Sequence, residues 1–181
     1  MKVTETKLQG VLVLEPACFR DSRGLFMETF NQARMASLGL PTDFKQDNFS
    51  LSRASVVRGI HYQIGKPQGK LVRVVTGEAL DVVVDLRRSS PTFGQHVSIE
   101  LSGDAAKMVW IPEGFGHGFS VLSEHVALTY KVTDYYSGVS ERTILWNDTA
   151  LGIDWRVAAE DAVLSDKDRA GVRFDLAEVF D

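Results

Sequence analysis

Residues suited to proton transfer occur within short β-rich segments of this sequence. Residues 58–63 read RGIHYQ, and a histidine has an unperturbed pKa of about 6.5, close to the pH at which a general base works. If this segment is a strand, His61 shares a face with Gly59 and Gln63, while Arg58 faces the other way. The pattern leaves two interpretations of His61 open: a general base inside a cavity, or a structural histidine hydrogen-bonded in the core or at the surface.

Three further residues are candidates for chemistry, and each has a structural alternative. Lys70 begins the apolar run KLVRVV; a lysine that points inward needs an anion or a developing anion as its partner, whereas a lysine at a strand end is commonly solvated. His117 follows a glycine-rich turn in IPEGFGHGF, which is compatible with a pocket wall or a structural histidine. Tyr130 ends the run VALTY and is either a proton donor or a core tyrosine whose hydroxyl is satisfied.

Other segments contain residue types that bind phosphates, bases and sugars. Arg23 and Phe26 lie in FRDSRGLFMETF, where arginines can clamp a diphosphate and phenylalanines can pack on a planar base; a charged hairpin is the alternative. Gln46 and Asn48 alternate along a predicted strand and can face hydroxyls or a base edge. In TDYYSG, adjacent tyrosines of a strand point to opposite faces, so one can stack on a base while the other packs.

A charged run near the C-terminus, LSDKD, supplies two more carboxylates, Asp166 and Asp168. A carboxylate can orient a histidine and raise its basicity, as an aspartate does in hydrolytic triads. A solvated loop is the alternative for such a run, and the charge pattern alone does not separate the two interpretations.

The elements that must position these residues are mostly short strands. Branched and alternating runs predict strands at residues 11–14, 71–75, 79–86, 96–101, 107–111, 119–122, 126–131 and 142–146. Asn31 predicts the start of a short helix that runs to Leu38, and a second helix is predicted at 158–163. No GxGxxG follows a strand and no GxxxxGK[ST] occurs, which excludes the doubly wound nucleotide-binding folds. The pattern predicts an all-β jelly-roll barrel with a few short helices and a mouth that holds a small ligand.

Length and composition predict one domain that spans residues 1–181. The formal net charge is −4, so no overall positive field attracts nucleic acid, and a ligand that carries phosphate needs local arginines and lysines. Cys18 is the only cysteine, which excludes an internal disulfide and suits a reducing compartment. No apolar run reaches the ~18 residues that span a bilayer, and the N-terminal segment does not resemble a signal peptide. We therefore expect a soluble, cytoplasmic protein without a membrane partner.

Taken together, these segments resemble those of the dTDP-4-dehydrorhamnose 3,5-epimerase family, in that family's order and over nearly the whole chain. The matching segments include QDNFSLS, VVRGIHYQ, QGKLVRVVTGEALDVVVDLRRSSPTFG, WIPEGFGHGFSVLS, YKVTDYYSGVSER and LSDKD. The resemblance implies a cupin-type jelly roll that forms a homodimer. It also implies an epimerase that inverts C3 and C5 of dTDP-4-dehydro-6-deoxy-D-glucose, giving dTDP-4-dehydro-L-rhamnose in activated L-rhamnose synthesis.

The resemblance also assigns roles to individual positions. His61 is implied to be the catalytic base, and Asp168 to orient it. Tyr130 matches the general acid, and Lys70 matches the residue near the C4 oxygen. The other implied substrate contacts are Arg23, Glu28, Gln46, Asn48, Arg58, His117, Tyr136, Glu141 and Lys167, with Tyr136 stacking on thymine.

Three alternatives to this function stay open. A relative that inverts one carbon only, or shifts the ketone, would use the same base, acid and lysine. A metal-dependent cupin would need several convergent ligands, but Gln63 stands where the second histidine of that arrangement is expected. A nucleotide-sugar-binding module without catalysis would not need the complete set of acid, base and lysine. We expect an enzyme without a metal or a cofactor: the ligand arrangement of a metal cupin is incomplete, and the inversion involves no redox change that would need a nicotinamide.

Overall fold

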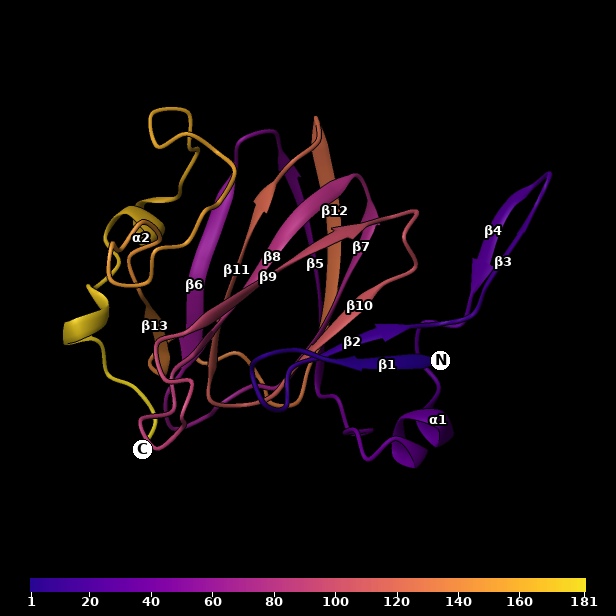
Figure 1. Ribbon diagram of the computed structural model, residues 1–181, viewed down its shortest axis with the longest axis horizontal. Coiled ribbons are helices and arrows are strands. Elements are labelled where there is room, and N and C mark those ends of the chain that lie inside the picture. The colour runs from indigo at the N-terminus through magenta and orange to yellow at the C-terminus, as the bar shows by residue number, and fades with distance from the viewer.

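The protein folds as two packed β-sheets with few helices (Figure 1), in a computed structural model that describes all residues 1–181. The strands are β1 (Lys2–Glu5), β2 (Leu12–Glu15), β3 (Cys18–Asp21), β4 (Gly24–Met27), β5 (Gln46–Arg53), β6 (Val57–Gln63), β7 (Lys70–Thr76), β8 (Glu78–Asp85), β9 (His96–Ser102), β10 (Met108–Ile111), β11 (Phe115–Val121), β12 (His125–Val132) and β13 (Glu141–Thr143). The helices are α1 (Gln32–Ser37), α2 (Asp166–Arg169) and the 3-10 helix η1 (Phe174–Leu176). None of them has the length and apolar character needed to cross a membrane.

The two large sheets face each other and enclose the main hydrophobic core. One sheet has six strands in the order β1-β2-β10-β7-β12-β5, and the other has five in the order β13-β6-β11-β8-β9. All neighbouring strands in them are antiparallel. Val74 and Leu128 of the first sheet are buried in one cluster with Val83 and Phe119 of the second. The predicted cupin-type jelly roll is therefore confirmed.

The chain that follows β13 covers the outer face of the five-stranded sheet. Trp146 and Trp155 are buried there with Ile60 of β6 and Val82 of β8. The Trp155 indole N–H donates to the Trp146 carbonyl at 2.7 Å, which satisfies the polar end of a buried ring. This covering segment brings α2 into contact with β6.

The first predicted helix is confirmed. α1 begins after Asn31, whose side chain accepts a hydrogen bond from the Arg34 N–H at 3.0 Å, as an N-cap does. Met35 is buried in a cluster with Leu14 and Met108. Because those residues belong to β2 and β10, α1 covers part of the outer face of the six-stranded sheet.

The second predicted helix, at residues 158–163, is wrong. The segment makes a single turn that ends at Asp161, and Val163 then lies extended in a parallel bridge with Val56. A β-branched residue with a strand to pair with gains more from that pairing than from one further helical turn. The helix of this region is α2 instead, which Ser165 caps.

The β3–β4 hairpin projects away from the two sheets (Figure 1). Its two aromatic residues, Phe19 and Phe26, have ring centroids 6.5 Å apart, yet their exposed fractions are 64% and 69%. The hairpin therefore presents apolar side chains that the rest of this chain does not cover.

Candidate active site

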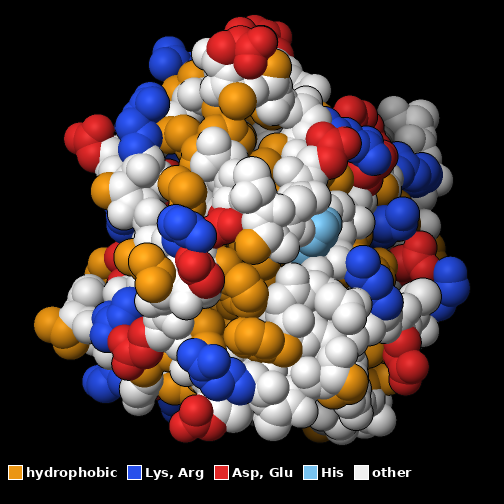
Figure 2. Space-filling model, turned by 60° about the vertical axis from the view of Figure 1, so that its left-hand side comes forward, with side chains coloured by type: hydrophobic (Ala, Val, Ile, Leu, Met, Phe, Trp, Pro, Cys, Tyr) orange, Lys and Arg blue, Asp and Glu red, His pale blue; other side chains and the backbone are white.

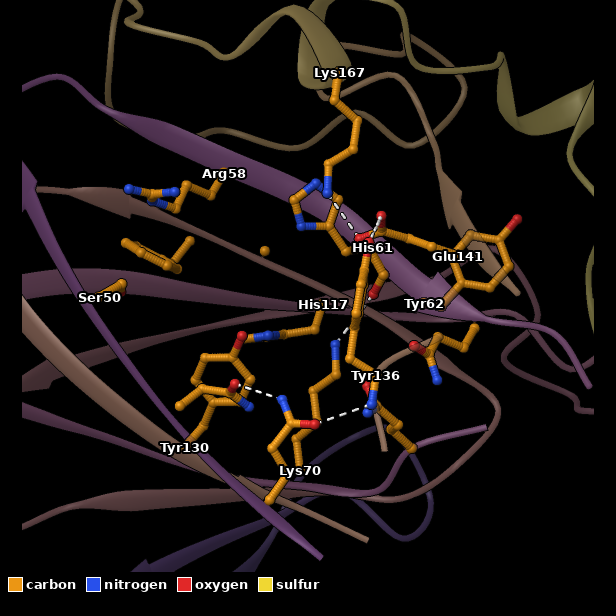
Figure 3. A pocket seen from close by; sticks show the side chains of 16 residues that line it. Ser50, Arg58, His61, Tyr62, Lys70, His117, Tyr130, Tyr136, Glu141 and Lys167 are labelled. Carbon is orange, nitrogen blue, oxygen red and sulfur yellow. Dashed lines mark hydrogen bonds and ion pairs between the residues drawn. The ribbon is translucent and has the colours of Figure 1, made fainter. Parts of the chain in front are cut away.

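A cavity of about 430 Å³ lies beside α2 and the loop that follows β12. Most of the residues predicted to act on a substrate line it: Gln46, Asn48, Arg58, His61, Lys70, His117, Tyr130, Tyr136, Glu141 and Lys167. In Figure 3, His61 and Lys167 lie on one side of the cavity, and Lys70 and Tyr130 on the other. These residues come from β5, β6, β7, β11, β12, β13, α2 and, for Tyr136, the loop after β12, so the fold brings distant parts of the sequence to one place.

His61 is paired with a buried carboxylate. Its Nε2 lies 2.6 Å from Asp168 Oδ1, and the exposed fractions of the two side chains are 25% and 3%. Burial lowers the pKa of His61, and Asp168 offsets that effect only in part. The imidazole is therefore neutral at neutral pH, with one ring nitrogen held by Asp168 and the other free to accept a proton.

Asp168 is held as a carboxylate by hydrogen bonds from three directions. Besides His61, the Ser165 hydroxyl donates to Oδ2 at 2.6 Å, and the Gly59 N–H donates to Oδ1 at 3.2 Å. Burial acts to raise the pKa of Asp168, but these hydrogen bonds together lower it to about 2. The run LSDKD is thus a short capped helix that presents Asp168 to His61, rather than a solvated loop.

A bulge in β6 places both Arg58 and His61 on the cavity wall. On β11, His117 lies opposite His61 and Phe119 lies opposite Arg58, so three residue steps of β6 match two of β11. Gly59, inside this bulge, has φ +118°, and a Cβ there would lie 2.6 Å from the backbone of β11. The prediction that Arg58 and His61 face opposite ways is therefore wrong, because regular alternation does not hold across a bulge.

Lys70 is a buried cation that reaches the cavity from β7. It is 7% exposed, and its Nζ donates to the His61 carbonyl at 3.2 Å. Burial lowers the pKa of Lys70 to about 8, while the negative charges of Asp81 and Glu141 act in the other direction. The ammonium group is therefore charged at neutral pH and can stabilise negative charge that develops on a bound molecule.

His117 has a buried carboxylate partner that sequence reasoning missed. Asp81 of β8 has its Oδ2 2.7 Å from His117 Nε2, and both side chains are buried. Oδ1 of Asp81 is buried without a hydrogen-bond partner. A signal was present in the sequence, because Asp81 interrupts the apolar run ALDVVVDL and a charged side chain inside a buried strand needs a partner.

Tyr130 supplies a phenol to the cavity from β12. Burial raises the pKa of Tyr130, and the negative charge of Glu141 adds to the increase, while Arg58 opposes it. The hydroxyl group is therefore protonated at neutral pH. Because Tyr130 lies across the cavity from His61 (Figure 3), a molecule between them would have a base on one side and a proton donor on the other.

A small polar network lies at the mouth of the cavity. The Tyr136 hydroxyl donates to Glu141 Oε2 at 3.1 Å, and Lys167 Nζ donates to Glu141 Oε1 at 2.7 Å. Burial acts to raise the pKa of Glu141, but the interactions with Lys167, Tyr136 and His61 together lower it. Tyr135 and Tyr136 lie in a loop and not in the predicted strand, and both rings are exposed.

Amides and cations form the remaining walls. The predicted alternation along β5 is confirmed, because Gln46, Asn48 and Ser50 all line the cavity. Lys167 and the Arg58 guanidinium, whose Nε donates to Ser52 Oγ at 3.0 Å, add positive charge. On the face in Figure 2, basic and acidic side chains are interspersed and no broad basic surface appears. A phosphate group would therefore be attracted by the individual cations of the cavity, Lys167 and Arg58.

Three predicted contacts, Arg23, Phe26 and Glu28, do not line this cavity. Arg23 Nη2 lies 2.6 Å from Asp21 Oδ2 within the projecting hairpin, where Phe26 also lies. Glu28 Oε1 lies 3.1 Å from Nε of Arg34 in α1. No part of the chain gathers three or more His, Cys, Asp or Glu side chains in positions to hold a metal ion.

Comparison with known proteins adds to this geometry. A family model described as dTDP-4-dehydrorhamnose 3,5-epimerase matches residues 5–175. The chain belongs to this epimerase family. A dTDP-4-dehydrorhamnose 3,5-epimerase from Pseudomonas aeruginosa is 50% identical to it, over 99% of this chain and 99% of the relative.

Solved structures of epimerases share the fold. The crystal structure of dTDP-6-deoxy-D-glucose-3,5-epimerase from Legionella pneumophila, in complex with dTDP-4-keto-L-rhamnose, has a TM-score of 0.94 at 45% identity and covers 98% of this chain and 94% of its own. A 3'-monoepimerase from Streptomyces bikiniensis, in complex with dTDP-quinovose, has a TM-score of 0.86 at 30% identity, covering 94% of this chain and 86% of its own. The fold of these epimerases therefore accompanies inversion of one carbon as well as of two.

Proposed function

We propose that this chain is an isomerase that inverts C3 and C5 of dTDP-4-dehydro-6-deoxy-D-glucose, giving dTDP-4-dehydro-L-rhamnose in the synthesis of activated L-rhamnose. One observation carries the proposal: a single cavity holds a paired base (His61), a buried cation (Lys70) and a protonated phenol (Tyr130). Inversion next to a ketone requires a base, stabilisation of an oxyanion and an acid. Membership of the epimerase family supports the choice of substrate.

The first step would remove a proton from a carbon next to the C4 ketone. The hydrogens at C3 and C5 are acidic because the resulting carbanion is delocalised onto the C4 oxygen as an enolate. The free ring nitrogen of His61 takes the proton, and Asp168 stabilises the imidazolium that forms. Lys70 donates a hydrogen bond to the enolate oxygen, and its attraction to that oxygen is stronger in the buried site than it would be in water.

The second step would return a proton to the same carbon from the opposite face. Tyr130 is positioned for this, because it lies across the cavity from His61 (Figure 3) and carries its proton at neutral pH. The phenolate then regains a proton as His61 loses one, and the cycle repeats at the other carbon. Each cycle exchanges protons only, so no oxidant or reductant is required, and Lys70 supplies the positive charge that stabilises the enolate.

The remaining residues of the cavity would hold the nucleotide and the sugar. Tyr136 is proposed to stack its exposed ring on thymine, and Arg58 to bind the diphosphate as a bidentate donor. Gln46, Asn48, His117, Glu141 and Lys167 are proposed as further contacts to the substrate. The positive charges of Lys167 and Arg58 support this assignment, because a diphosphate brings negative charge into the cavity.

We also propose a homodimer in which the hairpin of one chain reaches the cavity of the other. Arg23, Phe26 and Glu28 do not line the cavity of their own chain, and in a dimer the hairpin of a second copy would bring such residues to the substrate. Two uncovered apolar surfaces support the dimer: the hairpin, and the outer face of β5, where Phe49 and Leu51 are 66% and 63% exposed. We further propose that residues 1–181 form one domain. We also propose a cytoplasmic location, which suits the free thiol of Cys18.

Inversion of a single carbon is the second candidate, because the structurally similar Streptomyces bikiniensis protein is a 3'-monoepimerase. The two candidates differ in their product. Purified protein incubated with dTDP-4-dehydro-6-deoxy-D-glucose should yield dTDP-4-dehydro-L-rhamnose, which NMR identifies. The His61→Ala variant should yield none at the same enzyme concentration. A product inverted at one carbon would replace the first candidate with the second, and substrate that binds without change would contradict both.

A further inference from the structure

The loop that carries Tyr136 is held by side chains rather than by a strand ladder. Residues 133–137 form no regular secondary structure, yet four of their main-chain groups bind glutamine side chains. The Asp134 carbonyl accepts from Gln68 Nε2 at 2.7 Å, and the other three groups surround Tyr136. Gln63 Nε2 donates to the Tyr135 carbonyl at 3.3 Å, and Gln63 Oε1 accepts from the Ser137 N–H at 2.8 Å. The Tyr136 N–H itself donates to Gln46 Oε1 at 3.0 Å.

The Gln63 amide has no N–H left to donate to a ligand. Its second N–H donates to the Lys66 carbonyl at 2.7 Å, so both of its donors are used and its oxygen binds the Ser137 N–H. The residue is 4% exposed, although it lies in the cavity wall two positions after His61. The hydrogen bonds also fix the direction of the amide, because only its oxygen can accept from Ser137. Gln63 therefore acts on the loop and not on a bound molecule.

The Tyr136 ring has little else to hold it. Its exposed fraction is 58%, and the hydrogen bond from its hydroxyl to Glu141 is the one polar contact of its side chain. A loop of this kind that must be ordered on binding loses conformational entropy at that moment, which weakens affinity. Main-chain bonds on both sides of Tyr136 remove that cost in advance.

We infer that Gln63 is a positioning residue: by holding the main chain on both sides of Tyr136, it fixes the aromatic ring over the cavity mouth and sets the affinity for the base of the nucleotide. The inference rests on the proposed function, in which Tyr136 stacks on thymine. It assigns Gln63 to nucleotide binding rather than to proton transfer, although it is a neighbour of His61 on β6.

The Gln63→Met variant tests this, because methionine has a similar length and volume but makes no comparable hydrogen bonds. We expect the Kd for dTDP alone, measured by calorimetry, and the KM for the sugar nucleotide to rise together by about tenfold, within the range that a base–aromatic stack contributes. The kcat and the acid limb of its pH profile should stay unchanged. Gln95→Met, at an exposed position outside the cavity, is the matched control and should bind dTDP as the wild type does.

A double-mutant cycle with Tyr136→Ala separates positioning from general damage to the fold. In the Tyr136→Ala background, Gln63→Met should cause no further increase in Kd. The inference would be overturned if the two substitutions raised Kd by independent factors that multiply. It would also be overturned if Gln63→Met lowered kcat and shifted the acid limb of the pH profile. If the methionine variant does not fold, Gln63→Asn, whose amide is too short to reach both sides of Tyr136, should show the same pattern. A wild-type protein that does not bind dTDP would instead contradict the proposed function.

Discussion

Burial and nearby charges together set the protonation states of His61, Lys70 and Tyr130 in the cavity. His61 is neutral because it is buried, and it keeps its orientation because Asp168 holds one ring nitrogen. Lys70 is charged although it is buried, since Asp81 and Glu141 contribute negative charge nearby. Tyr130 retains its proton. The cavity therefore contains a free base, a cation and an acid at the same pH, which is the combination that epimerisation uses.

The value of kcat/KM should fall at both low and high pH, because the base must be unprotonated and the cation protonated. A base must be unprotonated, so activity falls as the pH drops through the pKa of His61, which burial places below its ordinary value of about 6.5. The cation must be protonated, so activity falls as the pH rises through the pKa of Lys70, at about 8. A Lys70→Arg variant should lose the basic limb, because a guanidinium stays charged. A basic limb that persists near pH 8 in this variant would show that another group causes it.

Replacing Asp168 with asparagine should lower kcat by at least about 100-fold. The amide would donate to Nε2 of His61 and so place the ring proton on the nitrogen that must accept one. Loss of the carboxylate should also lower the pKa of His61 further, since Asp168 raises it in the wild type. Asp166→Asn, at an exposed position of the same helix, is the control for both measurements and for thermal unfolding. Equal kcat in Asp168→Asn and Asp166→Asn would exclude the pairing from catalysis.

At the scale of elements, the bulge in β6 positions residues that the proposed reaction uses. It turns Arg58 and His61 to the same side, and it frees the Gly59 N–H to bind Asp168. Sequence patterns indicated the inward row on β5 and the faces that residues 58–63 would have as a strand, because alternation is a local property. They did not predict the bulge, which depends on how β6 pairs with β11. The His61–Asp168 contact joins residues 107 positions apart, so only the family resemblance indicated it.

Gly59→Ala should destabilise the protein by about 2–3 kcal/mol, because overpacking against β11 adds to the cost of an unfavourable φ. Gly24→Ala is a matched control: Gly24 has φ +129°, but a Cβ there would meet nothing within 4 Å. That variant should lose only about 1 kcal/mol. Urea unfolding measures both, and kcat of the Gly59 variant should fall as well. Equal stability of the two variants would show that the close approach to β11 is not limiting.

At the scale of the whole molecule, the projecting hairpin is the part that one chain leaves unexplained. The sequence suggested that Arg23 and Phe26 bind a substrate, and the structure places both away from the cavity of their own chain. A sequence can indicate that a residue binds the substrate, but it does not tell whether that residue contributes to the site of its own chain or of a second copy. A dimer in which each hairpin serves the partner's cavity reconciles the two observations.

Mixing two inactive variants tests this arrangement. Chains with His61→Ala and chains with Arg23→Ala, refolded together, form heterodimers in which one cavity has both His61 and an intact hairpin from the other chain. Activity should recover to about one quarter of the wild type, since about half of the dimers carry one complete site of two. Activity that stays at the level of the separate variants would place Arg23 at its own cavity or at none.

The dimer itself can be tested through the outer face of the six-stranded sheet. The double variant Phe49→Glu with Leu51→Glu places charge on the exposed apolar side of β5 and should elute at the 20.0 kDa of one chain, whereas the wild type should show twice that mass by light scattering. Leu176→Glu, at a residue 72% exposed on η1, is the control and should remain dimeric. A monomeric wild type would contradict the dimer.

Deuterium exchange at the two carbons tests the central claim most directly. Purified protein would be incubated with dTDP-4-dehydro-6-deoxy-D-glucose in heavy water, and NMR would follow deuterium at C3 and C5 together with the configuration of each carbon. If the cavity that holds His61, Lys70 and Tyr130 acts as proposed, we expect deuterium and inversion at both carbons without added metal. Deuterium at neither carbon, with substrate bound to the intact fold, would contradict the claim that this cavity abstracts protons next to the ketone.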